Sequence, residues 1–172
     1  MRFDHSMRLK FVFSVFLFAL TFPGLAFAEI LQGRVVSIAD GDTLTLLDSG
    51  NQQHRIRLAE IDAPEIGHGI NKPGQPWGQN SRQALAGLCF SKQAAIKVMD
   101  TDRYGRTVGR VVCEGKDANL AQVSAGMAWA YARYNRRPEI TKAENEARAA
   151  KRGLWADANN VPPWDWRKQP LH

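Results

Sequence analysis

Residues 30–58 have the sequence ILQGRVVSIADGDTLTLLDSGNQQHRIRL, and this stretch decides the fold. It begins with a β-rich run, Arg34–Ile38, which ends at a turn of Asp and Gly. Thr43–Leu46 then alternates polar and apolar residues, as a half-buried strand does. After the turn cluster Asp48–Asn51, the run His54–Leu58 starts a third strand. Three strands joined by short turns predict an antiparallel meander.

The remainder of the chain predicts two more strands and about three helices. Gly and Pro residues exclude regular structure from Ile66–Pro76. Beyond this loop we expect, in chain order, a helix at Gly78–Leu88, strands at Ala94–Met99 and Thr107–Cys113, a short helix at Asn119–Ser124 and a longer helix between Pro138 and Gly153. Five strands with helices inserted late predict a mainly β, α+β fold, namely a closed five-stranded β-barrel of the OB type.

The N-terminal residues 1–28 have the features of a secretory signal peptide. Met1–Lys10 is basic, Phe11–Phe22 is almost continuously apolar, and Ala26–Ala28 provides an A-x-A cleavage site. The apolar stretch is shorter than the roughly 20 residues that span a bilayer, so an uncleaved membrane anchor is the less favoured alternative. We therefore expect export to the periplasm or beyond the cell, with no membrane span after cleavage.

Cleavage would leave one domain over residues 29–157 and a tail over residues 158–172 that is rich in Pro and Trp. The run Val161–Trp166 contains too much Pro for a helix, and we expect the tail to dock on the barrel. In an oxidising compartment Cys89 and Cys113 can pair as a disulfide. The alternative is two buried free thiols, because spacing alone does not show that the two residues lie close together.

The whole chain has a formal net charge of +6, with 23 Lys and Arg against 17 Asp and Glu. This balance favours an anionic partner, but it does not separate nucleic acid from a membrane surface or from simple solubility. Basic residues concentrate in residues 133–152, which fits either a solvated helix face or a surface that follows a phosphate backbone.

Four carboxylates of the first half lie at expected strand ends or turns: Asp40, Asp42, Asp62 and Glu65. If the strand ends converge in a barrel, these four carboxylates share one site. Like charges so close together do not all stay ionised without a cation. Carboxylate oxygens without a His or Cys pair suit Ca²⁺ or Mg²⁺ better than Zn²⁺. The alternative for the first two is an ordinary turn, because Asp and Gly are common turn residues.

Several short motifs resemble those of the staphylococcal nuclease (thermonuclease) family, in the same order. They are Asp40–Thr43, Arg57–Glu65, Asp102–Arg106, Asn119, Gly126–Trp129 and Gly153–Trp155. Each motif is weak alone, whereas the ordered set over about residues 30–155 is specific. The resemblance implies an OB-fold, calcium-dependent endonuclease that hydrolyses the phosphodiester bonds of DNA and RNA and leaves 3′-phosphate ends.

The resemblance also implies a site for one Ca²⁺. Its ligands would be the carboxylates of Asp42 and Asp62 and the backbone carbonyl of Ala63, with Asp40 close by but not a ligand. The best-known member of the family has a Thr at the position of Ala63, but a carbonyl ligand does not depend on that side chain. Oxygen ligands alone admit Mg²⁺ as well.

Three catalytic residues follow from the same resemblance. Glu65 would orient or deprotonate the attacking water, as a carboxylate can. Arg57 and Arg106 would bind the phosphate, because a guanidinium fork pairs with two phosphate oxygens and stays protonated. A cation and two arginines would stabilise the charge that develops in the transition state.

Tyrosines would flank the nucleotide. Tyr104 and Tyr134 match aromatic positions of the family's pocket, whereas the family's other pocket tyrosine aligns with Ala132. Either the neighbouring Tyr131 replaces it or the contact is absent.

The spacing of Arg57 and Asp62 makes a structural prediction. Residues five apart on a regular strand point to opposite faces of the sheet. Both side chains reach one site only if the strand bends or bulges between Leu58 and Ile61.

A different class of function is a non-catalytic nucleic-acid-binding OB module, which would be expected to lack some of the charged site residues. The chain keeps all five of them: Arg57, Arg106, Asp42, Asp62 and Glu65. An envelope scaffold that uses the Trp-rich tail as its contact is a third alternative. DNA and RNA are the expected partners, and we expect a monomer.

Overall fold

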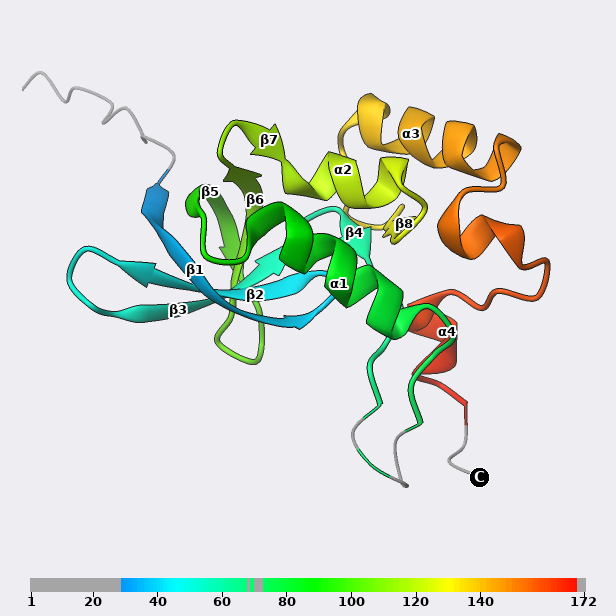
Figure 1. The fold of residues 1–172 in the computed structure, drawn as a ribbon, viewed down its shortest axis with the longest axis horizontal. Helices are drawn as coiled ribbons and strands as arrows, with labels where there is room; N and C mark the ends of the chain where they lie inside the picture. Colours follow the sequence, from blue (N-terminus) through cyan, green and yellow to red (C-terminus); the bar gives the residue numbers. More distant parts are fainter. Residues whose placement is uncertain (1–28, 68, 70–72, 170–172) are drawn as a thin grey trace, which may run out of the picture.

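Five long strands form the centre of the protein, in a computed structural model that describes residues 29–67, 69 and 73–169 (Figure 1). The strands are β1 (Ile30–Asp40), β2 (Thr43–Asp48), β3 (Gln53–Leu58), β5 (Gln93–Thr101) and β6 (Thr107–Cys113). The signal peptide expected in residues 1–28 lies outside the described residues.

The barrel closes because β3 pairs on both of its sides. The strand order is β3-β2-β1-β5-β6 with antiparallel neighbours, and β3 also pairs in parallel with β6. Residues 30–34 of β1 pair with β5 and residues 33–40 pair with β2, and two register shifts in the pairing with β2 let β1 curve. The predicted five-stranded OB-like barrel is confirmed.

Alternating apolar residues fill the barrel interior, as the period of a strand requires. Six residues from five strands have no exposed surface: Val35, Leu44, Leu46, Ile56, Ile96 and Val111. A second cluster combines Trp129, Ala147, Leu154 and Trp155, and the partly buried Trp77 and Trp164 pack against it. The two clusters join the barrel to the helical end of the molecule.

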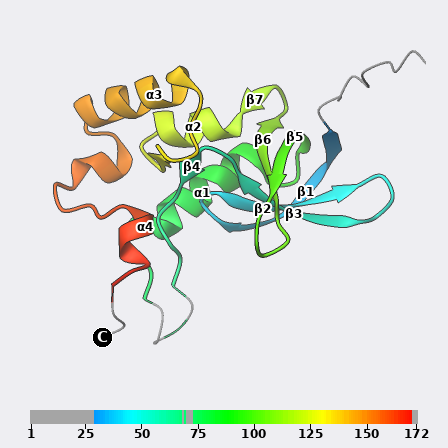
Figure 2. The ribbon, with the colours of Figure 1, turned by 180° about the vertical axis from the view of Figure 1, so that it is seen from behind.

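Helices and short strands complete the fold. The helices are α1 (Gly78–Cys89), α2 (Ala118–Ser124), α3 (Pro138–Ala149), the 3₁₀ turn η1 (Gly153–Ala156) and α4 (Pro163–Trp166). The short strands β4 (Ile61–Asp62) and β8 (Trp129–Ala130) pair with each other, and β7 (Lys116–Asp117) pairs with β6. Both views show α3 and α4 at the opposite end of the molecule from the turn between β2 and β3 (Figures 1 and 2).

The tail differs from the sequence expectation, because it contains the helical turn α4. The prediction that Pro excludes a helix here was wrong, since Pro163 occupies the first turn, where a missing backbone N–H leaves no hydrogen bond unmade. The tail does dock: Trp164 packs against the second hydrophobic cluster.

Cys89 and Cys113 form a disulfide whose Cα atoms lie 5.4 Å apart. It joins the end of α1 to the end of β6, and both residues are buried. Among the described residues, no helix is long and apolar enough to cross a bilayer.

Candidate active site

The chain turns sharply between β3 and β4. Glu60 has a φ of 67°, in the left-handed region that residues other than Gly rarely adopt. Two hydrogen bonds of Ala59 stabilise the turn. Its N–H donates to the carbonyl of Gly109 at 2.8 Å, and its carbonyl accepts from the Asn119 amide at 2.8 Å. The predicted departure from a straight strand is confirmed.

The turn brings Arg57 against Asp62, with Nη2 2.7 Å from Oδ1. The other end of the guanidinium fork, Nη1, donates to the carbonyls of Leu58 and Ile61 at 2.8 and 3.0 Å and lies 3.1 Å from Asp42 Oδ2. Arg57 therefore lies between two carboxylates. Its hydrogen bonds to the carbonyls of Leu58 and Ile61 also stabilise the turn between β3 and β4.

Asp42 reaches the same point from the turn between β1 and β2. Its Oδ2 accepts the N–H of Ala63 at 2.7 Å, and its Oδ1 accepts the Thr43 hydroxyl at 3.1 Å. Asp40 lies next to Asp42, and its Oδ1 accepts the N–H of Asp42 at 3.0 Å. The structure thus brings together Asp40, Asp42, Arg57, Asp62 and Ala63.

Burial dominates the electrostatics of the two central carboxylates. Asp42 and Asp62 have 5% and 1% of their surface exposed. Burial raises the pKa of both, and the neighbouring carboxylates add to the rise, while Arg57 lowers it in part. Burial alone would lower the pKa of Arg57, but Asp42 and Asp62 raise it above its ordinary value. Ionised carboxylates so placed require nearby positive charge.

Glu65 lies just beyond β4, on the loop that leads to α1. Its N–H donates to the side-chain oxygen of Gln75 at 2.9 Å. Its carboxylate accepts from Arg167, which also lies 2.7 Å from Asp62 Oδ2. Gln75 and Arg167 were missed as site residues in the sequence, because Gln75 belongs to no motif and Arg167 lies in the tail, 105 positions from Asp62.

Arg106 approaches the site without touching its carboxylates. It is bound to Asp102, through Nε to Oδ2 at 2.7 Å, and its Nη1 lies a long 3.5 Å from the Thr43 hydroxyl. Burial raises the pKa of Asp102, but hydrogen bonds from Arg106 and Tyr104 outweigh it and hold that pKa below its ordinary value. The Thr43 hydroxyl contacts both this guanidinium and Asp42 Oδ1.

The three predicted pocket tyrosines have different surroundings. Tyr104 and Tyr134 are 68% and 54% exposed, so both rings are accessible. Tyr131 contacts Tyr134 edge-on, with ring centroids 4.9 Å apart, and lies parallel to Trp164, with centroids 5.2 Å apart. One face of Tyr131 is therefore covered by the tail.

The donor set fits a hard cation. Two buried carboxylates and a backbone carbonyl are oxygen ligands of the kind that Ca²⁺ or Mg²⁺ binds. Within the described ranges, no three His, Cys, Asp or Glu side chains lie close enough to share an ion. If Asp42 and Asp62 bind a cation, the cation would need further oxygen ligands, such as the carbonyl of Ala63 and water or phosphate oxygens.

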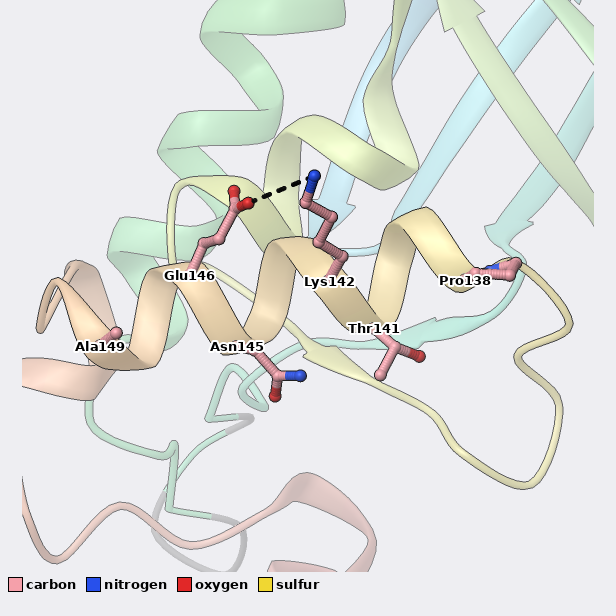
Figure 3. Close-up of a pocket in the computed structure, with 6 residues that line it drawn as sticks. All are labelled: Pro138, Thr141, Lys142, Asn145, Glu146 and Ala149. Atoms are coloured by element: carbon pink, nitrogen blue, oxygen red, sulfur yellow. Dashed lines mark ion pairs between the residues drawn. The ribbon is translucent and has the colours of Figure 1, made fainter.

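A surface hollow on the outer side of α3 is a separate feature (Figure 3). It is lined by Pro138, Thr141, Lys142, Asn145, Glu146 and Ala149. Its charged pair, Lys142 and Glu146, lies 3.9 Å apart, and none of the predicted site residues lines it. The hollow is therefore not the candidate site.

An OB barrel in which two buried carboxylates, a glutamate and arginines lie close together is typical of an enzyme that hydrolyses phosphodiester bonds. Such a set can hold a cation, bind a phosphate and orient a water, which are the requirements for hydrolysing a phosphodiester.

The model of the family "Staphylococcal nuclease homologue" matches residues 55–157. The chain belongs to this family, and it is a nuclease. It is 43% identical to an "Uncharacterized endonuclease" of Haemophilus influenzae, over 79% of this chain and 72% of the relative. It is 41% identical to a "Micrococcal nuclease" of Shigella flexneri, over 80% of each chain. It is 38% identical to a "Probable staphylococcal-like nuclease CAN2" of Oryza sativa subsp. japonica, over 78% of this chain and 33% of the relative.

Proposed function

We propose that the protein is an exported, calcium-dependent endonuclease that cleaves DNA and RNA and leaves 3′-phosphate ends. The observation that supports the proposal is the contact of Arg57 with both Asp42 and Asp62, because a guanidinium that can bind phosphate lies beside two carboxylates that can bind a cation. One Ca²⁺ would be bound at each site. One chain supplies every site residue, so we propose that it acts as a monomer.

The residues divide the chemistry of phosphodiester cleavage between them. A cation at Asp42 and Asp62 would supply positive charge to the phosphate oxygens. Arg57 would bind the same phosphate, and Arg106 would stabilise its developing charge after releasing Asp102. Glu65 would hold the attacking water and accept its proton. Tyr104 and Tyr134 would pack against the nucleotide, since exposed rings can stack on bases.

Removal of divalent cations is expected to abolish cleavage. The purified protein would be incubated with single-stranded DNA, duplex DNA or RNA in Ca²⁺, in Mg²⁺ or in EDTA. We expect cleavage in Ca²⁺, none in EDTA, and restoration when excess Ca²⁺ is added. The DNA products should resist extension at their 3′ ends by terminal transferase until phosphatase removes the 3′-phosphate. Equal cleavage in EDTA would contradict the calcium requirement.

Export is proposed from residues 1–28, which have the composition of a signal peptide. The Cys89–Cys113 disulfide supports it, because such bonds persist in oxidising compartments. The full-length chain, expressed in a bacterial host, should yield an exported product that begins at Glu29 and has no free thiol by mass spectrometry. A product that keeps residues 1–28 and reacts with thiol reagents would contradict the proposal.

A further inference from the structure

The C-terminal tail lies against the loop that carries Glu65. Both ribbon views show α4 beside the segment between β4 and α1 (Figures 1 and 2). Pro163 is buried, and the ring of Trp164 lies parallel to Tyr131, at an interplanar angle of 4°. Trp166 lines a cavity of about 70 Å³ together with Trp77 and Trp129. The tail is therefore packed on the body of the enzyme through aromatic side chains.

The tail holds the backbone of Glu65 through Gln75. This side chain is 8% exposed and uses both ends of its amide. Its oxygen accepts the N–H of Glu65 at 2.9 Å, and its nitrogen donates to the carbonyl of Val161 at 2.8 Å. The N–H of Gln75 in turn donates to the carbonyl of Glu65 at 2.9 Å. A buried amide thus links the catalytic loop to the start of the tail.

The tail also holds the side chain of Glu65, through Arg167. The guanidinium contacts the Glu65 carboxylate and both oxygens of Asp62, at 2.7 and 3.3 Å. In the part of the chain that the structure describes, Arg167 is the side chain that hydrogen-bonds this carboxylate. A planar fork that contacts two carboxylates fixes their separation, which a single ammonium does less well.

We propose that the tail Val161–Arg167 is part of the active site and that Arg167 is a positioning residue, which holds the Glu65 carboxylate beside Asp62. The proposal rests on the catalytic role proposed for Glu65. Glu65 follows a strand of two residues on an irregular loop, and its side chain is one-third exposed. Without Arg167 the carboxylate would rotate among several rotamers, and few of them would point at the attacking water.

Four variants of the purified protein test the proposal: Arg167→Gln, Arg167→Lys, Glu65→Gln and the double variant Glu65→Gln/Arg167→Gln. Arg167→Gln is expected to lower kcat about ten- to a hundredfold, as loss of a residue that orients a ligand group does elsewhere, with a smaller change in KM. Arg167→Lys should recover part of kcat, because it restores the charge without the fork. Lys168→Gln is the matched control, since it removes one neighbouring charge that pairs with the exposed Asp165.

The double variant separates positioning from general stability. If Arg167 acts through Glu65, Arg167→Gln should have no further effect on kcat in the Glu65→Gln background. Additive losses, or an unchanged kcat for the single variant, would overturn the proposal. A higher kcat would overturn it too, because it would make the tail a plug that excludes the cation. Unfolding midpoints of all variants would be measured alongside, and a wild type that cleaves nothing would refute the proposed function instead.

Discussion

The variant Arg57→Lys is expected to fold and to lose roughly a thousandfold or more of its turnover, the scale found when an arginine that stabilises phosphoryl-transfer charge is removed. Arg57 makes four close contacts with its fork, to two carboxylates and two backbone carbonyls. An ammonium at the same place keeps the charge but does not span those acceptors and a phosphate together.

The matched control is Arg55→Lys. Arg55 lies two positions earlier on β3, is exposed, and is not part of the carboxylate cluster. We expect its kcat and KM to stay within about twofold of the wild type, since exposed surface substitutions have small effects. Steady-state cleavage of a short fluorescent oligonucleotide in saturating Ca²⁺ measures both variants. Equal losses for Arg55→Lys and Arg57→Lys would show that the loss does not come from the contacts of Arg57 with Asp42 and Asp62.

Both the barrel and the bend could be predicted from the sequence. Alternation of apolar residues identified the strands, because one face of each must fill the interior. The bend between Leu58 and Ile61 followed from a spacing: two residues five apart had to serve one site. The structure resolves it as a two-residue turn, with Glu60 in the left-handed region. The strands needed only neighbouring residues, whereas the bend also needed the family resemblance, which assigned Arg57 and Asp62 to one site.

Contacts between distant segments were not predictable in this way. Arg167 reaches Asp62 across 105 positions, and Gln75 reaches Val161 across 86. No periodicity or spacing connects such residues. The cover of Tyr131 by Trp164 depends on the same docking of the tail. The short helix α4 was missed because Pro was taken only as a helix breaker, whereas it is compatible with the first turn.

The ion pairs of Glu60, which lies in the turn between β3 and β4, were not predicted from the sequence either. Glu60 has a side chain that is 1% exposed, although charged residues are rarely so buried unless paired. It accepts from Nη2 and Nε of Arg110 at 2.7 and 3.1 Å. Nε of Arg137, at the start of α3, lies 3.0 Å from its Oε2 as an ion pair without hydrogen-bond geometry. Glu60 thus joins the bend to β6 and to α3.

The variant Glu60→Ala is therefore expected to lower the free energy of unfolding by about 3–5 kcal/mol, the cost of breaking a buried ion pair by removing one partner. Arg137 keeps its pair with Asp117 but lies largely buried, and Arg110 loses both hydrogen bonds. The control is Glu139→Ala. Its carboxylate lies 3.6 Å from the same Arg137 but is 53% exposed, so a change of no more than about 1 kcal/mol is expected.

A comparison of Glu60→Gly with Glu60→Ala separates the ion pairs from the backbone. Both variants lose the carboxylate, but only Gly adopts the φ of 67° without a steric penalty. Glu60→Gly should therefore be the more stable of the two by about 1 kcal/mol, measured by urea unfolding at equilibrium. If the two unfold together, the left-handed turn costs nothing. The expected order means that the turn which brings Arg57 to Asp62 is strained, whereas the difference between the wild type and Glu60→Ala measures the ion pairs with Arg110 and Arg137.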